Sequence, residues 1–349
     1  MNGPTFELPP GQEACAPPEY RGVARDGVRL LVSGPDLDED RTFGDLREVL
    51  RSGDLLVVNE SATLPASLPA RGHPGEFRMN LSTEYGPGLW VAEPRWGPDA
   101  PGPLPLMEGE RIEVAGVPAR WLASYPGIPR LGFLRFEQDP SAAIAAQGRP
   151  IRYAYLGREY PLAAYQTVFG RIPGSAEMAS AGRPFSAALV GDLRARGVEF
   201  APVVLHAGVS SLETAPGTPV QDLLYPEPFD VPRATVEAVL AARRRGGRVI
   251  AVGTTVARAL ETATGGGCLR AARGFTRLYL SAARPSRSFD ALLTGFHTAT
   301  STHLALLASF VGEARLERSY RAALEGGYLW HEFGDSHLLL RDRDRPGAG

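Results

Sequence analysis

The stretch Arg248-Val-Ile-Ala-Val-Gly-Thr-Thr-Val-Ala-Arg-Ala-Leu-Glu261 decides the fold class of this chain. Its first part, Val249–Val252, is apolar without interruption and predicts a short buried strand. Gly253 ends the strand, and the apolar spacing after it predicts a helix that carries Arg258 and Glu261. A strand that passes through glycine into a helix is typical of an α/β protein.

The start of this predicted helix is also a candidate binding site. Free backbone N–H groups at a helix start suit a ligand with carboxylate, hydroxyl or ring-nitrogen acceptors, and Thr254 and Thr255 are candidate caps. An ordinary strand-to-helix turn is the simpler interpretation of the same residues. The rest of the chain decides between the two.

Two further segments repeat the same order of helix, glycine and strand. Their strands are continuously apolar, which indicates that helices cover both faces of the sheet. The three predicted helices are residues 42–50, 186–196 and 232–245, and the strands that follow them are residues 55–58, 200–205 and 249–252. The main body is therefore predicted to be α/β.

Polar residues follow each of the three strands. The first strand is followed by Asn59-Glu60-Ser61, the second by His206, and the third by Gly253-Thr254-Thr255. Ligands of open α/β sheets bind beyond the carboxyl ends of the strands. Three polar strand ends therefore predict one common site.

The composition and the hydrophobic pattern change between residues 65 and 161, where prolines and glycines are frequent and helical periodicity is absent. Short alternating runs predict strands at residues 77–82, 89–92, 111–114, 119–124 and 131–136. We predict a small all-β, barrel-like domain inserted at residues 65–161. The α/β domain is then discontinuous, over residues 1–64 and 162–349, and its sheet is mixed. Helices are predicted again at residues 301–310 and 316–324.

Composition limits the class of protein. The chain has 349 residues, 44% hydrophobic, with a net charge of −2 and no lysine, which describes a globular protein without a generally basic surface. No apolar run reaches the roughly 20 residues of a membrane helix. Cys15 and Cys268 lack metal-ligand spacing, the histidines form no metal motif, and we expect no metal, no membrane association and a cytoplasmic location.

One local basic patch, Arg243-Arg244-Arg245, is a candidate RNA contact. The same three residues lie in the predicted last turn of a helix, where cations offset the helix dipole. Both interpretations stay open at this point.

Taken in order, the motifs of the chain resemble one family from end to end. That family is the S-adenosylmethionine:tRNA ribosyltransferase-isomerases of queuosine biosynthesis. The segments that carry the resemblance are Gly53-Asp-Leu-Leu-Val-Val-Asn59, Pro65-Ala-Ser-Leu68, Tyr165-Gln-Thr-Val-Phe169, Ala181-Gly182, Leu205-His206, Val249-Ile-Ala-Val-Gly-Thr-Thr255 with Arg258-Ala-Leu-Glu261, Phe296-His297 with Ser301-Thr302, and Phe333-Gly-Asp335.

The resemblance implies an α/β domain with an inserted β-barrel and an unusual use of S-adenosylmethionine as co-substrate. Enzymes of the family transfer and isomerise its ribosyl portion onto the aminomethyl group of a deazaguanine base in tRNA, and they release adenine and methionine. Such chemistry needs a protein base, a site that excludes water, and contacts for adenine and the amino-acid tail.

The chain departs from the family pattern at several polar positions, while His206, Glu227, the Gly-Thr-Thr turn, Arg258 and His297 persist. This pattern fits a retained S-adenosylmethionine site with an altered acceptor side. The altered segments are Asn59-Glu60-Ser61-Ala62 for Asn-x-Thr-Arg, Ala181-Gly182-Arg183-Pro184-Phe185 for Ala-Gly-Leu-His-Phe, Leu224-Tyr225-Pro226-Glu227 for Met-His-x-Glu, and Gly295-Phe296-His297-Thr298-Ala299 for Asn-Phe-His-Leu-Pro.

Three residues are the catalytic candidates. His206 is a candidate general base or donor, although a satisfied histidine at a strand end is an equal alternative. Glu227 is a candidate base or ribose ligand, and the alternative interpretation is a solvated carboxylate in a loop. His297 lies in a polar helix start that suits a carboxylate or a ribose.

The cofactor-binding candidates, whose alternative roles are structural, are Tyr165, Gly253, Thr254, Thr255, Arg258, Ser301 and Thr302. Tyr165 is expected to stack on adenine or to pack in the core. Ser301 is a ligand contact or an N-cap. As the structural alternative for Arg258, it and Glu261, three apart on one helix, could form only a surface pair worth about 0.2–0.5 kcal/mol.

Three functions remain open on the sequence. The first is the ribosyltransferase-isomerase reaction on modified tRNA, and the second uses the same S-adenosylmethionine site with a small-molecule acceptor. The third, a non-catalytic protein that binds RNA or nucleosides, is the weakest. We expect a monomer or a weak dimer.

Overall fold

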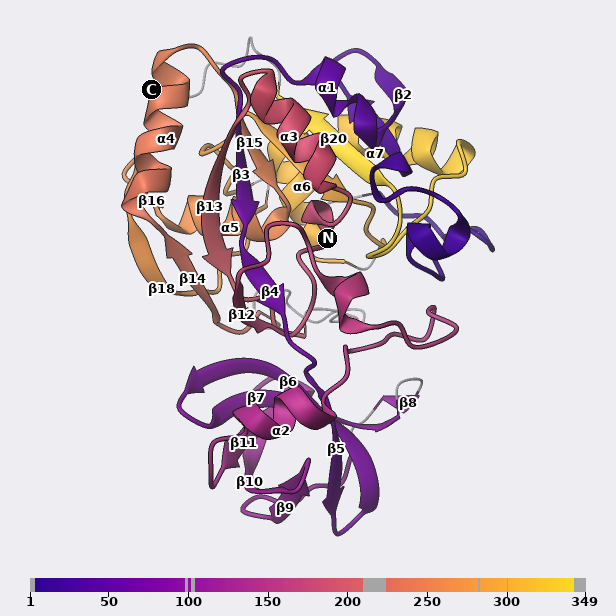
Figure 1. Cartoon of the computed structure of the whole chain (residues 1–349), viewed down its shortest axis with the longest axis vertical. Helices are drawn as coiled ribbons and strands as arrows, with labels where there is room; N and C mark the ends of the chain where they lie inside the picture. The colour runs from indigo at the N-terminus through magenta and orange to yellow at the C-terminus, as the bar shows by residue number, and fades with distance from the viewer. Residues whose placement is uncertain are drawn as a thin grey trace.

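The computed structural model describes residues 4–97, 100–101, 104–209, 224–281, 283–299 and 301–341, and it shows two domains, one above the other in Figure 1. The larger is an α/β domain built from both ends of the chain, and the smaller is a β-barrel formed by the middle. The predicted fold class, a mixed α/β sheet with an inserted barrel, is confirmed.

The α/β domain is organised around a nine-stranded sheet in the order β18-β14-β13-β3-β15-β19-β20-β1-β2. Neighbouring strands from β13 to β19 run parallel, and antiparallel pairs lie toward both edges. The strands are β1 Arg29–Ser33, β2 Asp38–Thr42, β3 Leu55–Asn59, β13 Glu199–Leu205, β14 Glu227–Val231, β15 Val249–Val252, β18 Ala272–Thr276, β19 Ala291–Gly295 and β20 Ser336–Leu340.

Helices cover both faces of this sheet, because successive side chains of β3 belong to two different hydrophobic cores. Leu55 and Val57 belong to the core beneath α4, α5, α6 and α7, whereas Leu56 and Val58 belong to the core beneath α1 and α3. The helices are α1 Leu46–Val49, α2 Ser141–Gln147, α3 Ala187–Ala195, α4 Arg233–Arg244, α5 Thr254–Thr262, α6 His303–Val311 and α7 Glu313–Glu325, and the 3₁₀ turns are η1 Pro18–Arg21, η2 Arg25–Gly27, η3 Phe43–Asp45, η4 Leu162–Tyr165 and η5 Ser180–Gly182. No helix among them is long and apolar enough to cross a membrane.

The first predicted helix is shorter than its sequence suggests. Residues 43–45 form the 3₁₀ turn η3, and only Leu46–Val49 is α-helical. The side chains of Thr42 and Asp45 cap each other's backbone N–H groups, which is the reciprocal arrangement of a capping box.

The inserted domain is a closed six-stranded antiparallel barrel in the order β11-β10-β9-β5-β6-β7, because β11 also pairs with β7. Its strands lie within the predicted insert, whose limits at residues 65 and 161 stay a prediction. They are β5 Ser67–Gly72, β6 Gly75–Gly86, β7 Leu89–Gly97, β8 Ala100–Pro101 (on the outer side of β7), β9 Arg111–Val114, β10 Val117–Tyr125 and β11 Ile128–Phe136. Two small sheets complete the chain, β4 Ser61–Thr63 with β12 Ile172–Ser175 and β16 Thr264–Gly265 with β17 Cys268–Leu269.

The side chain of Asn59 holds the ends of neighbouring strands together. It lies at the end of β3, is 3% exposed, and donates to the carbonyl of Leu205 (2.8 Å) and to Thr255 Oγ1 (3.3 Å). Its Oδ1 accepts from the backbone N–H groups of Leu205 and Ser61, both at 3.1 Å. Asn59 therefore brings the ends of β3 and β13 and the start of α5 together, and their use as one common site stays a prediction.

Tyr225 fixes the junction between the two domains. It is buried beside Val91 and Ile128 of the barrel. Its hydroxyl donates to the carbonyl of Val209 (2.8 Å) and lies 2.8 Å from Ser82 Oγ. Tyr225 stands where the family motif has histidine, and its side chain makes a structural contact there.

We expect Asn59→Ala to lower the free energy of unfolding by about 2–4 kcal/mol, because the buried N–H and carbonyl of Leu205 and the N–H of Ser61 lose their partner. Chemical denaturation measures the change. Leu240→Ala, at a side chain that is 41% exposed on α4, is the control and should change stability by less than about 0.5 kcal/mol. An equally small effect of Asn59→Ala would contradict this role.

Candidate active site

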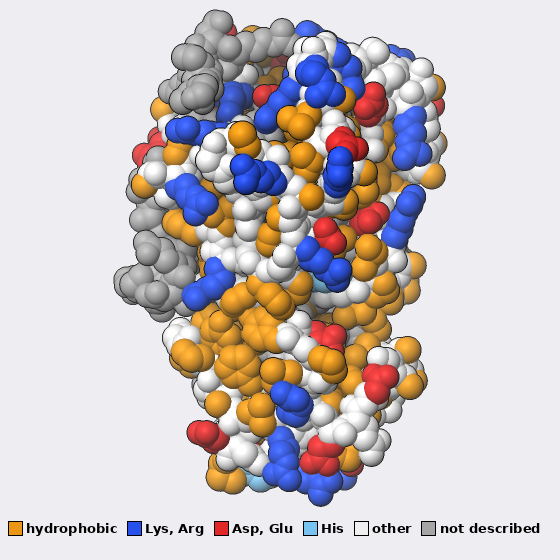
Figure 2. All heavy atoms as spheres, turned by 90° about the vertical axis from the view of Figure 1, so that its left-hand side faces the viewer, with side chains coloured by type: hydrophobic (Ala, Val, Ile, Leu, Met, Phe, Trp, Pro, Cys, Tyr) orange, Lys and Arg blue, Asp and Glu red, His pale blue; other side chains and the backbone are white. Residues whose placement is uncertain are grey.

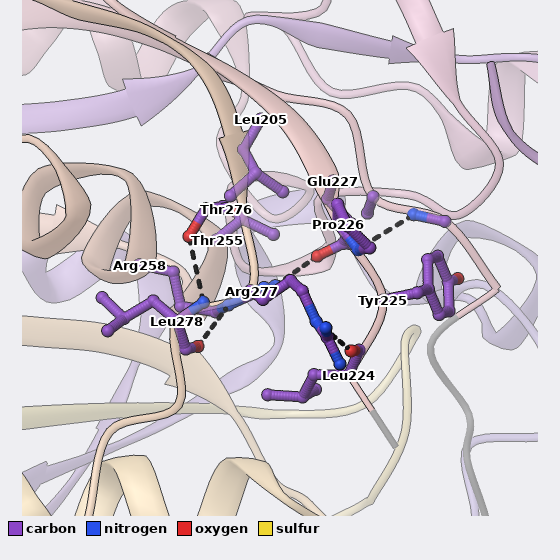
Figure 3. A network of polar contacts seen from close by, with 12 residues as sticks. Leu205, Leu224, Tyr225, Pro226, Glu227, Thr255, Arg258, Thr276, Arg277 and Leu278 are labelled. Carbon is purple, nitrogen blue, oxygen red and sulfur yellow. Dashed lines mark hydrogen bonds and ion pairs between the residues drawn. The ribbon is translucent and has the colours of Figure 1, made fainter. Parts of the chain in front are cut away.

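A buried ion pair joins Glu227 on β14 and Arg258 on α5 (Figure 3). The two side chains are 6% and 12% exposed. Glu227 Oε2 accepts from Arg258 Nη1, and Oε1 accepts from the backbone N–H of Gly208 at 2.8 Å. Arg258 Nε donates to the carbonyl of Leu278 at 3.2 Å. The pair therefore joins the sheet edge to α5 and to the chain that follows β18.

The predicted surface pair between Arg258 and Glu261 is wrong. Arg258 turns to the strand carboxylate, and Glu261 is buried on α5, where it accepts from the N–H and hydroxyl of Ser288 at 2.7 and 2.8 Å. Two residues on one helix turn have separate tertiary partners, which spacing along the chain does not reveal.

A cleft with about 520 Å³ of open space lies beside this pair. Arg258 Nη2 is buried and has no hydrogen-bond partner among the described residues. A buried N–H group without a partner is costly, so this nitrogen suits a ligand that brings a hydrogen-bond acceptor. The lining residues are Leu224, Tyr225, Glu227, Arg258, Leu278, Tyr279, Leu280, Thr302, His303 and Leu306.

His303 is a cleft residue that the sequence interpretation missed. It begins α6, and its Nδ1 lies 3.0 Å from Ser301 Oγ, which also accepts the His303 backbone N–H at 3.2 Å. Burial, assisted by the charge of Arg258, lowers the pKa of His303 to about 4, so its ring is neutral at pH 7. The signal available was its place directly after Ser301 and Thr302.

His297 lies behind this histidine. The two rings are 4.5 Å apart between centroids, and His297 Nε2 lies 3.0 Å from Thr294 Oγ1. Burial, with the neighbouring histidines, holds the pKa of His297 well below its usual value. His297 is thus neutral and contacts the cleft through His303 rather than lining it.

His206 lies apart from this cleft. Its Nδ1 is 2.7 Å from Ser61 Oγ, which is 2.6 Å from Ser175 Oγ. Strand pairing sets Leu205 opposite Phe229, so Glu227 shares the face of Phe229, whereas His206 points to the other face of the sheet. Burial lowers the pKa of His206. The structure therefore does not bring the two strongest catalytic candidates together.

The helix start at Gly253 differs in detail from the prediction. Gly253 itself is the N-cap of α5, with φ = 99°, a conformation that glycine adopts without strain. No side chain caps this end, so the predicted threonine caps are wrong. Thr254 is buried, and Thr255 accepts a hydrogen bond from Asn59. Thr255 and Arg258 are one turn apart on α5, which places the helix start near the cleft.

Tyr165 lies in a packed aromatic cluster rather than in the cleft. It is 2% exposed, and its ring meets Phe333 edge-on at 5.2 Å. The aromatic residues that line the cleft are Tyr225, which is buried, and Tyr279, which is only partly buried.

A second cleft contains a residue from an altered family motif, Arg183. Its Nη2 is 2.8 Å from Glu19 Oε2 and its Nε donates to the carbonyl of Ala164, so it holds segments together. Glu332 lines the same cleft, and burial raises its pKa to about 8. Asp335 accepts from the backbone N–H groups of Leu329 and Arg29, which closes a turn.

The basic patch of the sequence is partly used within the fold. Arg243 donates to the carbonyl of Ser288, and Arg245 pairs with Glu199 while it donates to the carbonyl of Gly53. Within the described ranges, no three His, Cys, Asp or Glu side chains are grouped as a metal site would require.

The fold and the cleft together define an α/β enzyme with an inserted β-barrel, and comparisons identify its family. The family model of queuosine biosynthesis proteins matches residues 2–339. An S-adenosylmethionine:tRNA ribosyltransferase-isomerase of Thermus thermophilus is 38% identical over 96% of this chain and 98% of its own length, and that of Anaeromyxobacter sp. strain K is 35% identical over the same shares. The crystal structure of the S-adenosylmethionine tRNA ribosyltransferase from Thermotoga maritima is 29% identical, with a TM-score of 0.54 over 96% of this chain and 99% of that one.

This chain therefore belongs to the family of S-adenosylmethionine:tRNA ribosyltransferase-isomerases. The resemblance found in the sequence motifs is confirmed.

Removal of one partner of the buried pair should be strongly destabilising. We expect Glu227→Gln or Arg258→Gln to lower the free energy of unfolding by about 3 kcal/mol, because the remaining charge stays buried alone. The double variant should lose less free energy of unfolding than the two single variants lose together. The exposed Arg233–Glu237 pair on α4 is the control, with an effect below about 0.5 kcal/mol. Additive losses at Glu227 and Arg258 would contradict a direct pair.

The low pKa of His303 predicts a pH-dependent stability. Because the unfolded chain binds this proton near pH 6.5 and the folded chain only near pH 4, stability falls as the pH drops from about 6.5 toward 4. The difference in Tm between wild type and His303→Gln should shrink across this window. Thr302→Val is the non-titrating control. A difference that stays constant with pH would contradict the buried neutral histidine.

Proposed function

We propose that this enzyme transfers and isomerises the ribosyl portion of S-adenosylmethionine onto the aminomethyl group of a deazaguanine base in tRNA, with release of adenine and methionine. One observation carries the site assignment: the cleft holds a buried carboxylate paired with an arginine whose Nη2 lacks a partner among the described residues. The names of the relatives support the two substrates.

Arg258 and Glu227 are proposed as the central polar contacts. Arg258 Nη2 is suited to the carboxylate of the methionine tail or to a ribose oxygen, since guanidinium–carboxylate hydrogen bonds are among the strongest. Glu227 has two fixed oxygens, each with further acceptor capacity. Glu227 is proposed either to take the proton from the substrate or to accept a hydrogen bond from a ribose hydroxyl.

The remaining cleft residues suit the neutral parts of the ligand. Tyr279 offers an aromatic ring to adenine. His303 keeps a neutral ring because of burial, and its Nδ1 lies against Ser301, so its Nε2 is proposed to hydrogen-bond to a sugar or a base. Thr302 adds a hydroxyl at the start of α6.

The co-substrate supplies the reactivity, because its sulfonium acidifies the adjacent 5′ carbon and its sulfur then leaves as part of methionine. The protein holds the proton acceptor and excludes water. The leucines at positions 224, 278, 280 and 306 give the cleft apolar walls for this purpose.

The other candidates are proposed for supporting positions. His297 is placed to fix the ring of His303, and Ser301 to fix its Nδ1. Gly253, Thr254 and Thr255 shape the start of α5. His206 is proposed to hold the end of β13 against the start of β14, since its backbone N–H donates to the carbonyl of Pro228, next to Glu227, at 3.0 Å.

A second acceptor is favoured by one observation. The histidines of two family motifs are absent, because Pro184 stands in place of one and Tyr225, whose hydroxyl makes internal contacts, stands in place of the other. Neither position therefore offers an imidazole to a base. A small-molecule amine in place of tRNA is the alternative acceptor for the same S-adenosylmethionine site.

The test is the release of adenine and methionine from S-adenosylmethionine, measured by liquid chromatography. We expect release with tRNA that carries the aminomethyl-deazaguanine base, and none with unmodified tRNA. Glu227→Gln should lower kcat by about 100-fold or more, because it removes the proposed proton acceptor. Arg233→Gln, on the exposed face of α4, is the control. Absence of release from folded enzyme with the modified tRNA would refute the tRNA reaction, and release with a free amine would establish the alternative.

A further inference from the structure

The edge strand β18 presents an alternating set of side chains to the outside. Arg273, Phe275 and Arg277 are exposed, whereas Thr276 between them is 2% exposed and hydrogen-bonds to Thr262 on α5. Alternation along a strand places the three exposed residues on one face. This face consists of an aromatic ring with a cation on either side.

Aromatic residues of the barrel extend the face across the domain junction. The ring of Tyr85 on β6 meets Phe275 edge-on at 5.5 Å, and Phe133 on β11 lies 6.5 Å from Tyr85. Tyr125 on β10 lies 5.2 Å from Phe133. Figure 2 shows hydrophobic side chains gathered at this level of the molecule, with basic side chains close by. Phe275 is 51% exposed, so its ring is accessible from solvent.

Among the described residues, the contacts of the two arginines beside the ring leave much of their positive charge available. Arg277 donates to the carbonyl of Leu224 (2.8 Å), which leaves its charge uncompensated by that contact. Arg273 is 86% exposed, and its Nε lies 3.9 Å from Asp230, a distance too long for a hydrogen bond. The face therefore combines an exposed π-surface with positive charge.

This face adjoins the cleft around the sheet edge. Strand pairing sets Thr276 opposite Glu227 and Phe275 opposite Pro228. Glu227 and Thr276 thus point to the α5 side, and Phe275 and Arg277 point to the barrel side. Leu224, which accepts from Arg277, also lines the cleft. A chain lying on the outer face reaches the cleft by turning over this edge.

We propose that Arg273, Phe275 and Arg277, with Tyr85, form a stacking platform for unpaired RNA nucleotides next to the modified base. The proposal rests on the proposed tRNA reaction. A base inside a duplex cannot reach a buried cleft, so the substrate base must leave its stack. Aromatic rings hold unpaired neighbouring bases, and arginines hold the phosphates between them.

The binding test uses a labelled unpaired RNA of about 12 nucleotides and a blunt RNA duplex of the same length, measured by fluorescence anisotropy. We expect the unpaired strand to bind more tightly. Phe275→Ala should weaken its binding by about 5- to 150-fold, as for the loss of one stacked base, whereas Phe275→Trp should retain it. Arg273→Ala and Arg277→Ala should each reduce the salt dependence of log K by about 0.7.

Matched controls lie elsewhere on the surface. Trp96→Ala removes another exposed ring, 47% exposed on β7, and Arg321→Ala removes an exposed arginine of α7. Both should leave RNA binding unchanged. Equal affinities of wild type and Phe275→Ala for the unpaired strand would overturn the proposal, as would tighter binding of the duplex.

Two further readouts separate this proposal from the proposed function. Phe275→Ala should leave thermal stabilisation by S-adenosylmethionine unchanged, and it should raise the KM for modified tRNA while retaining kcat at saturation. If RNA binding depends on Phe275 but no adenine is released, the platform stands and the proposed reaction fails. If adenine is released with an unchanged KM in Phe275→Ala, the platform fails and the reaction stands. A changed association state in sedimentation, with unchanged RNA binding, would mark the face as a protein interface and overturn the proposal.

Discussion

The buried pair of Glu227 and Arg258 is the constraint on which the architecture of the site depends. Two charges away from water persist only when their geometry and further hydrogen bonds compensate for lost hydration. Here Gly208 supplies an N–H to the carboxylate and Leu278 supplies a carbonyl to the guanidinium. These bonds fix β14, α5 and the segment after β18 relative to one another, and Nη2 of Arg258 keeps no partner among the described residues.

The same edge of the sheet has different chemistry on its two faces. The α5 side carries the ion pair and the neutral His303 beside it, and the barrel side carries the exposed ring of Phe275. Tyr225 locks the barrel against this edge through Ser82 and Val209. The inserted domain is therefore placed to complete an outer surface next to the cleft. This arrangement fits a small reactive co-substrate on one side and a long flexible acceptor on the other.

Much of the fold was predictable because its signals are local. The apolar strands after Gly53, Gly197 and Gly246-Gly247 and the alternating runs of the barrel each report their own secondary structure, and all three helix–glycine–strand units are present. Less of the site was predictable. The partner of Arg258 is 31 positions away on a strand that β-propensity did not reveal, whereas Glu261, its neighbour along the helix, faces Ser288.

The strand ends illustrate the same limit. Their polar residues do converge, through Asn59, but alternation about β13 and β14 sends His206 and Glu227 to opposite faces. Register between strands is a tertiary property, so the sequence could place both residues at one edge without deciding which face each would occupy. His303 was missed because it occupies an ordinary helix-start position, where only its neighbours in space reveal its burial.

The most direct test of this account is a crystal structure of the enzyme with S-adenosylmethionine. The account predicts the ligand in the cleft between β14, α5 and α6, with an acceptor oxygen within hydrogen-bond distance of Arg258 Nη2 and its adenine against Tyr279. Density for the ligand in the cleft beside Arg183 and Glu332, or on the His206 side of the sheet, with Arg258 Nη2 untouched, would contradict it.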